Sequence, residues 1–257
     1  MLEFHHLHLR VRDLAASTGF YAGPLGFVLV RANADQAEFA LESGGPVRLT
    51  LTGDRTARPA PPDAAGLFHA ALLLPGREAL GAWLRRAADA GVKFDGFSDH
   101  GVSEAIYLAD PDGNGLEIYA DRPPSAWPRH NGEIAMFTKP LDLPGLLAAS
   151  AIPPAAPALA GARWGHLHLR VTDLERSARF YQDELGVVAT QTSYPGARFL
   201  AADGYHHHLG LNTWGHPQRP RPAGALGLME ATFARTNLTT VKELKDPDGI
   251  HLSLVTP

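Results

Sequence analysis

The sequence predicts an α+β fold built from four copies of one module, a strand followed by a helix and three further strands (βαβββ). Three observations predict it. Short segments of alternating apolar and polar residues are separated by segments with helical spacing, turn residues mark their ends, and a long stretch recurs 160 residues later. A repeat of this length indicates two domains of one fold.

The repeated stretch covers the first strand and helix of two modules. Residues 164–187, WGHLHLRVTDLERSARFYQDELGV, match residues 4–27, FHHLHLRVRDLAASTGFYAGPLGF. Modules one and three are therefore expected to share one structure. The identical pairs include His6 and His166, His8 and His168, Arg10 and Arg170, Asp13 and Asp173, Phe20 and Phe180, Tyr21 and Tyr181, and Gly26 and Gly186.

Module one is expected to start with a strand at residues 7–11, in which alternation places His6 and His8 on one face. Asp13 is a suitable N-cap for the helix that follows, and glycines end this helix before residue 27. Three short strands complete the module: residues 27–32, 37–43 and 47–53.

Module two repeats this order after a Pro/Ala-rich segment, and its helix is amphipathic and stopped by Gly91. Its last two strands form a hairpin around the turn sequence DPDGNG. The expected elements are a strand at 68–74, a helix at 77–90, the segment KFDGFSDH at 93–100, and strands at 105–109 and 116–120.

The domain boundary is predicted in a second Pro/Ala-rich segment, with one short helix at 141–150. We therefore expect domains at 1–122 and 162–257, joined by a linker at 123–161. Module four ends on DPDGIHLSLV, which resembles the module-two hairpin. It is about twenty residues shorter than module two, so its helix is expected to be largely missing.

Composition excludes several classes of function. The net charge of −4 offers no basic surface for nucleic acid, and no apolar run is long enough for a membrane span or a secretion signal. We therefore expect a cytoplasmic protein without a nucleic-acid or membrane partner. Cysteine is absent, which excludes disulfides, thiolate metal sites and cysteine nucleophiles, and leaves 13 histidines as the main stock of metal ligands.

The hairpin of module two carries the strongest chemical signal. Glu117 alternates with apolar neighbours, so its side chain points to one face of the strand, and if that face is buried the carboxylate needs a cation or hydrogen-bond donors. His100 and Tyr107 precede it closely and bring an imidazole and a phenol to the same region. The alternative is an edge hairpin with a solvated glutamate.

Four such modules, with HLHLRV, FY and LG in the first and YLADPDGNGLEIY in the second, resemble the vicinal oxygen chelate superfamily of glyoxalases, bleomycin-resistance proteins and type I extradiol dioxygenases. The bacterial catechol 2,3-dioxygenase-like branch is the most similar. The resemblance implies that the modules pair into two barrel-like domains, the fourth module being shortened. The extradiol pattern reads His100, Ile106-Tyr107, Asp110-Pro111, Gly113 and Glu117 here, with Ser98 as a departure from it.

The resemblance implies a metal held by a first-strand histidine from each of two modules and by the hairpin glutamate, here His6, His69 and Glu117. Two imidazoles and one carboxylate suit Fe(II) that binds a diol and dioxygen together, with Mn(II) as the alternative. The implied substrates are a catechol-type aromatic diol and dioxygen. His100 would then move a proton, and Tyr107 would hold a substrate oxygen.

A different module pairing stays open. If modules two and three share a barrel, His69 and Glu117 would join His166 and His208 instead of His6. In the second half, the positions that match His69 and Glu117 are Met229 and Ser253, so modules three and four cannot build the same triad. We favour His6, and expect the C-terminal domain to be degenerate.

Two rival functions remain. A glyoxalase-type metal-dependent isomerase or lyase needs a fourth ligand on the last strand of module one, where VRLTLTG offers none. A non-catalytic protein that binds aromatic drugs usually lacks a triad. Each residue also has a purely structural alternative: His6 as a hydrogen-bonded strand histidine, His100 as a loop imidazole and Tyr107 as a packing residue. A homo-oligomer is compatible with the sequence.

Overall fold

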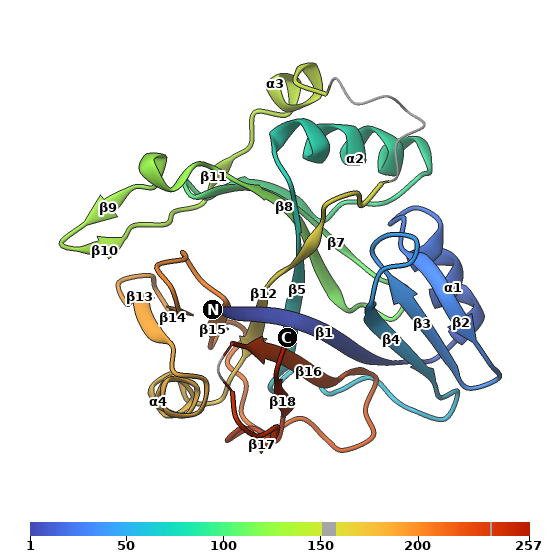
Figure 1. Ribbon diagram of the computed structural model, residues 1–257. Helices are drawn as coiled ribbons and strands as arrows, with labels where there is room; N and C mark the ends of the chain where they lie inside the picture. Colours follow the sequence, from blue (N-terminus) through green and yellow to red (C-terminus); the bar gives the residue numbers. More distant parts are fainter. Residues whose placement is uncertain (151–157, 237) are drawn as a thin grey trace.

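A computed structural model describes residues 1–150, 158–236 and 238–257 of the chain. Two curled β-sheets form its body, and helices cover their outer sides (Figure 1). The predicted α+β fold is confirmed. Residues 151–157 of the expected linker lie outside the described residues.

The first half of the chain contains modules one and two, with boundaries close to those expected. Module one comprises β1 (Leu2–Val11), α1 (Leu14–Ala22), β2 (Val28–Ala32), β3 (Gln36–Ala40) and β4 (Val47–Gly53). Module two comprises β5 (Gly66–Leu74), α2 (Arg77–Asp89), β6 (Gly96–Asp99), β7 (Ser103–Ala109) and β8 (Gly115–Asp121).

The second half contains the linker elements and modules three and four. The linker holds a 3₁₀ turn (Pro124–Ala126), β9 (Arg129–His130), β10 (Glu133–Ile134), β11 (Lys139–Pro140) and α3 (Leu143–Ala148). Module three comprises β12 (Arg163–Arg170), α4 (Leu174–Leu185), β13 (Val188–Gln191), β14 (Ala197–Ala201) and β15 (Leu209–Asn212). Module four comprises β16 (Gly227–Arg235), β17 (Lys242–Lys245) and β18 (His251–Val255).

Local sequence explains the helix starts. The side chain of Asp13 accepts hydrogen bonds from two backbone N–H groups of the first turn of α1, and Asp173 caps α4 by accepting from the backbone N–H of Arg176. Helix α4 ends at Gly186, which adopts the left-handed conformation with φ of 61°. The described residues between β16 and β17 form no helix, as expected for the shortened module four.

The module pairing corrects the expected division into domains 1–122 and 162–257. The seven-stranded sheet has the order β17-β18-β16-β1-β4-β3-β2 and joins modules one and four. The nine-stranded sheet has the order β11-β6-β7-β8-β5-β12-β15-β14-β13 and joins modules two and three. The two halves of the chain therefore exchange modules, with β1 antiparallel to β16 and β5 antiparallel to β12.

The connections between the sheets explain this exchange. Residues 54–65 lead from the seven-stranded sheet to the nine-stranded sheet, and residues 213–226 lead back. The two connections run side by side: Ala64 bridges Arg219, Arg219 pairs with Asp63 at 2.7 Å, and Leu226 N donates to Arg58 O at 2.9 Å. Each connection therefore stabilises the other in its crossing path.

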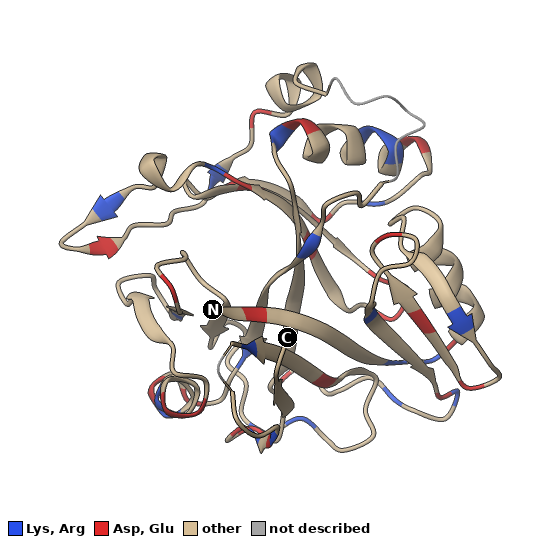
Figure 2. Ribbon diagram, in the orientation of Figure 1, with Lys and Arg blue, Asp and Glu red and all other residues tan. Residues whose placement is uncertain are grey.

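The buried core is continuous between the sheets. Trp164 of β12 is 2% exposed, packs against Phe4 and Phe27 with tilted rings, and donates its indole N–H to Arg48 O at 2.7 Å. Along the ribbon, Lys and Arg residues are interspersed with Asp and Glu residues (Figure 2). Among the described residues, no helix is long and apolar enough to cross a bilayer.

Replacing Trp164 with alanine is expected to lower the free energy of unfolding by about 3–5 kcal/mol, because it removes a buried aromatic side chain at the contact of the two sheets. Urea titration followed by circular dichroism measures the loss. Trp164→Phe keeps most of the packing and removes the N–H donor, so its loss should be clearly smaller. Equal stability of Trp164→Ala and the unmodified protein would contradict this packing.

Candidate metal centre

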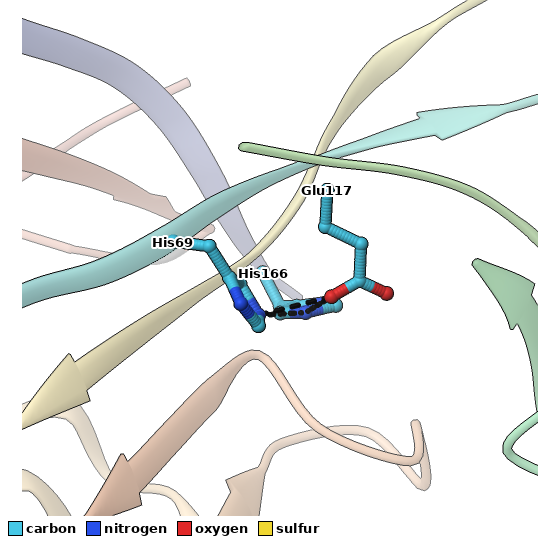
Figure 3. Close-up of side chains that lie close together, drawn as sticks. All are labelled: His69, Glu117 and His166. Atoms are coloured by element: carbon cyan, nitrogen blue, oxygen red, sulfur yellow. Dashed lines mark hydrogen bonds and ion pairs between the residues drawn. The ribbon is translucent and has the colours of Figure 1, made fainter. Parts of the chain in front are cut away.

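Three neighbouring strands of the nine-stranded sheet bring two imidazoles and one carboxylate together (Figure 3). His69 lies on β5, His166 on β12 and Glu117 on β8. Glu117 Oε2 lies 2.9 Å from His69 Nε2 and 3.3 Å from His166 Nε2, and the two Nε2 atoms lie 3.4 Å apart. All three residues are at most 5% exposed.

Strand register explains why these side chains converge. Ala71 of β5 pairs with His166 on one side and with Glu117 on the other, and directly paired residues point to the same face of a sheet. His69 lies two residues before Ala71 and therefore shares this face. The small side chain of Ala71 leaves the space that the three larger ones fill.

The donor set fits a divalent metal. Ligands about 2.1 Å from one ion and at neighbouring coordination positions lie roughly 3.0–3.4 Å from one another, and the three measured separations of 2.9, 3.3 and 3.4 Å are close to that range. Two histidines and one carboxylate on one side of the ion form the arrangement typical of non-haem Fe(II) oxygenases, which leaves further positions open. These residues could therefore hold such an ion.

Electrostatics favours the protonation states that metal binding needs. Burial lowers the pKa of His166 to about 4 despite the attraction of Glu117, so the imidazole is neutral near pH 7 and offers a lone pair. Burial raises the pKa of Glu117, but the adjacent His166 and His69 outweigh it and hold that pKa well below its usual range. The carboxylate is therefore ionised.

The group opens into a cavity of about 250 Å³. This volume is near the lower end of the range for small-molecule sites, so the cavity suits a small ligand. One side is aromatic, and the described lining residues include no Lys or Arg. The lining consists of Phe68, His69, Ser98, His100, Ser103, Tyr107, Glu117, Met136, Thr138, His166, His168, Tyr194, Phe199, His207 and Trp214.

His100 and Tyr107, both predicted from the sequence, form a hydrogen-bonded pair at this cavity. His100 Nδ1 lies 2.8 Å from Phe137 O, which can only accept, so Nδ1 carries the proton. In the neutral ring, Nε2 then accepts from the Tyr107 hydroxyl at 2.7 Å. Burial, together with Glu117, raises the pKa of Tyr107 well above its ordinary value, so the phenol keeps its proton. Tyr107 also pairs with Glu117 across the hairpin.

His6 does not belong to this group, which corrects the ligand set favoured from the sequence. It lies on β1 in the seven-stranded sheet and its Nε2 is 2.9 Å from Thr50 Oγ1. His6 is therefore a hydrogen-bonded strand histidine, which is the structural alternative given for it above. His166, its repeat partner, takes the corresponding place because β12, and not β1, is adjacent to β5.

His208 does not belong to the group either. Its Nδ1 accepts from Ala202 N at 3.3 Å, and it does not line the cavity. The neighbouring His207 lines the cavity instead, and its ring centroid lies 4.1 Å from that of His166. His168 also lines it, two residues after His166 on the same strand face. Alternation from His166 predicts His168, whereas the sequence HHH gives no sign of which histidine faces inward.

The seven-stranded sheet carries a changed copy of the centre. His8 and His168 are equivalent in the repeat; His168 pairs with His69 on β5, and His8 pairs with Glu230 on β16. The structural counterpart of His69 is therefore Glu230 and not Met229. Ser253, the counterpart of Glu117, donates its hydroxyl to Glu230. Among the described residues, only the His69 group meets the geometry of a metal centre.

Comparisons with known proteins agree with this fold. The family model for the Glyoxalase/Bleomycin resistance protein/Dioxygenase superfamily matches residues 3–118 and 163–239. The chain belongs to this superfamily. The matched residues cover nearly all of modules one to three and the first strand of module four.

One relative is similar to this chain over most of its length. The chain is 41% identical over 224 residues to a catechol-2,3-dioxygenase of Bacillus subtilis (strain 168), covering 86% of this chain and 78% of the relative. Among solved structures, a putative dioxygenase from B. subtilis matches 99% of this chain and 84% of its own, with a TM-score of 0.66 and 17% identity. A glyoxalase I mutant from Zea mays matches 100% and 92%, with a TM-score of 0.60 and 17% identity. The two structures support the fold alone.

The repeat provides a matched pair of variants for the ligand set. His166→Ala is expected to lose most of the bound metal after anaerobic iron loading, because it removes one of three ligands. His6→Ala, the same change at the equivalent position of the other sheet, should keep about one ion per chain. Metal analysis by mass spectrometry measures both. Metal loss in His6→Ala with retention in His166→Ala would reverse the assignment.

The buried histidines predict a dependence of stability on pH. Burial lowers the pKa of His208 to about 4, whereas it is near 6.5 in the unfolded chain. As the pH falls below 6.5 the unfolded chain takes up the proton first, so stability is lost as the pH falls from 6.5 toward 4.

At pH 5, relative to pH 7, His208 is expected to lower the free energy of unfolding of metal-free protein by about 2 kcal/mol. Urea titrations at the two pH values measure the difference. His208→Gln should show a smaller difference, because glutamine does not titrate. An identical difference in both proteins would contradict a neutral buried His208.

Proposed function

We propose that the protein is an extradiol ring-cleaving dioxygenase that acts on a catechol-type aromatic diol and uses a metal ion held by His69, Glu117 and His166. The observation that carries this proposal is the buried group of three ligands at the end of a small, partly aromatic cavity. The similarity to a catechol-2,3-dioxygenase over most of the chain supports the same class of reaction. Fe(II) is the proposed ion, with Mn(II) as the alternative.

Fe(II) bound there would supply a Lewis acid and a redox centre for the diol and dioxygen. The protein's own residues then bind and orient the substrate. The aromatic side chains Phe68 and Trp214 offer apolar faces to its ring. Because the described lining has no Lys or Arg, we propose that the diol carries no anionic substituent.

The pair of Tyr107 and His100 is placed to manage a proton. The Tyr107 hydroxyl donates to His100 Nε2, so the phenol oxygen keeps its lone pairs free to accept from a substrate hydroxyl. His100 is in turn oriented by Phe137 O through its Nδ1–H. A proton that leaves the substrate can pass to Nε2 through the phenol, which is general base catalysis by a positioned imidazole.

The rival glyoxalase-type reaction is less well supported. The group that meets metal-site geometry among the described residues has three members, and no fourth protein ligand joins it. A binding protein without catalysis does not account for the oriented pair of His100 and Tyr107. We therefore keep the ring-cleaving reaction as the proposal.

Anaerobic loading with Fe(II), followed by catechol and air, is expected to produce a ring-opened product that absorbs in the near-visible. Glu117→Gln should abolish this signal, because a neutral amide is a poor replacement for the carboxylate ligand. Wild-type protein that takes up iron but releases no ring-opened product from catechol or alkylcatechols would overturn the proposal. Turnover of a thiohemiacetal with Zn²⁺ would favour the glyoxalase alternative.

His100→Phe should retain the metal and bind catechol with little change, yet turn over about 10²–10⁴-fold more slowly. The physical reason is that the proton acceptor contributes in the transition state more than in substrate binding. Stopped-flow absorbance with separate metal analysis measures both effects. Loss of the metal, or unchanged turnover, would exclude this role for His100.

A further inference from the structure

The linker between modules two and three contributes one wall of the cavity. Its hairpin β9–β10 lies beside β13 (Figure 1). After β10, residues 135–138 form no regular strand, and Met136 and Thr138 of this segment line the cavity. The Met136 side chain is buried in a cluster with Trp127 and Phe199. The linker therefore shapes the cavity, although it lies outside the four modules.

Gln191 of β13 fixes the backbone of Met136. Its side-chain Oε1 accepts from Met136 N at 3.0 Å, and its Nε2 donates to Met136 O at 3.1 Å. Because Met136 N can only donate and Met136 O can only accept, a single orientation of the amide satisfies both bonds. Gln191 is 4% exposed, so the bonds are shielded from water. Its side chain thus takes the place of a neighbouring strand for Met136.

The next residue of the linker is fixed from the opposite side. Phe137 N donates to His100 O at 3.3 Å, and Phe137 O lies 2.8 Å from His100 Nδ1. Two consecutive residues are therefore bonded through both of their backbone groups, Met136 to module three and Phe137 to module two. Gln191 holds the segment whose carbonyl group orients His100.

The repeat offers an internal comparison for Gln191. The edge strands β2 and β13 have the same bulge, between Leu29 and Arg31 and between Ala189 and Gln191. Arg31 is therefore the counterpart of Gln191. Its side chain is exposed and pairs with Glu38 at 2.7 Å. The buried amide occurs on the edge that contacts the linker, which indicates a role in holding the linker.

We propose that Gln191 is a positioning residue that fixes Met136 as a wall of the cavity and thereby limits the size of the ring substituent that the diol can carry. The wall acts by shape, because the thioether is only a weak acceptor. Methionine has a flexible side chain, so its backbone has to be held if the wall is to stay in place. The limit on the diol rests on the proposed function, whereas the hydrogen bonds of Gln191 do not.

The first measurement is hydrogen–deuterium exchange of the Met136 amide, followed by NMR of the full chain. In the unmodified protein this amide is expected to exchange slowly, because its acceptor is buried. In Gln191→Leu, which has a similar size and no amide, exchange should be about ten-fold faster. Arg31→Leu, the matched change on the edge of the other sheet, should leave the exchange rate unaltered.

The second measurement is calorimetric titration of Zn²⁺-loaded protein with catechol and with phenylcatechol, a neutral diol with a second ring. The unmodified protein is expected to bind catechol more tightly. Met136→Ala opens the wall and keeps the backbone bonds to Gln191, so it should reduce this preference about ten-fold. Gln191→Leu should reduce it too, and Arg31→Leu should not. The ratio of the kcat/KM values of the Fe(II) form should change in the same direction.

Rapid exchange of the Met136 amide in the unmodified protein would overturn the inference. An equal preference for catechol in Met136→Ala and the unmodified protein would also overturn it. These two results do not depend on Gln191→Leu, so the inference stays testable if circular dichroism shows that this variant does not fold.

The outcomes also separate this inference from the proposed function. Slow exchange and the expected change of preference, in a protein that cleaves no diol, would support the wall and refute the dioxygenase. Catechol cleavage with an unaltered preference in both Met136→Ala and Gln191→Leu would support the dioxygenase and refute the wall.

Discussion

The antiparallel pairing of β5 with β12 is the interaction on which the candidate centre depends. It places first strands from two different modules side by side, and β8 lies on the other side of β5. Each of the three strands contributes one ligand atom to a region about 3 Å across. If β5 were paired with β1 instead, His6 would replace His166 and the aromatic residues of module three would be absent from the cavity.

Much of this arrangement could be predicted from the sequence, because it depends on local rules. Capping by Asp13 and Asp173, alternation along the first strands and the turn chemistry of DPDGNG all act within a few residues. These rules predicted four modules and the largely missing helix of module four, and the family resemblance assigned His69 and Glu117 to one site.

The rest could not be predicted, because a repeated sequence contains the same local information twice. His6 and His166 have almost identical surroundings in the chain, and either first strand can lie antiparallel to β5. The choice depends on two crossing connections that bind each other, through contacts such as Asp63 with Arg219, which are distant in sequence. Likewise, the order of three consecutive histidines does not reveal that His207, and not His208, faces the cavity.

The register of one hairpin positions both Glu117 of the candidate centre and Asp121, which lies 2.8 Å from His206 Nε2. A shift of one residue would turn Glu117, Tyr119 and Asp121 together to the opposite face of β8. The turn opposes such a shift: Asp110 Oδ1 accepts from the backbone N–H groups of Asp112 and Asn114 at 2.9 and 2.8 Å.

The same carboxylate also links the turn to the other sheet, since Tyr21 of α1 donates its hydroxyl to Asp110 Oδ2 at 3.1 Å. Tyr181 and Asp246 repeat this contact at 2.9 Å in the other half of the molecule. Each hairpin turn is therefore fixed by a helix that belongs to the opposite sheet. Because the positions of Glu117 and Asp121 both follow from this turn, the contact between the sheets determines which groups reach the cavity.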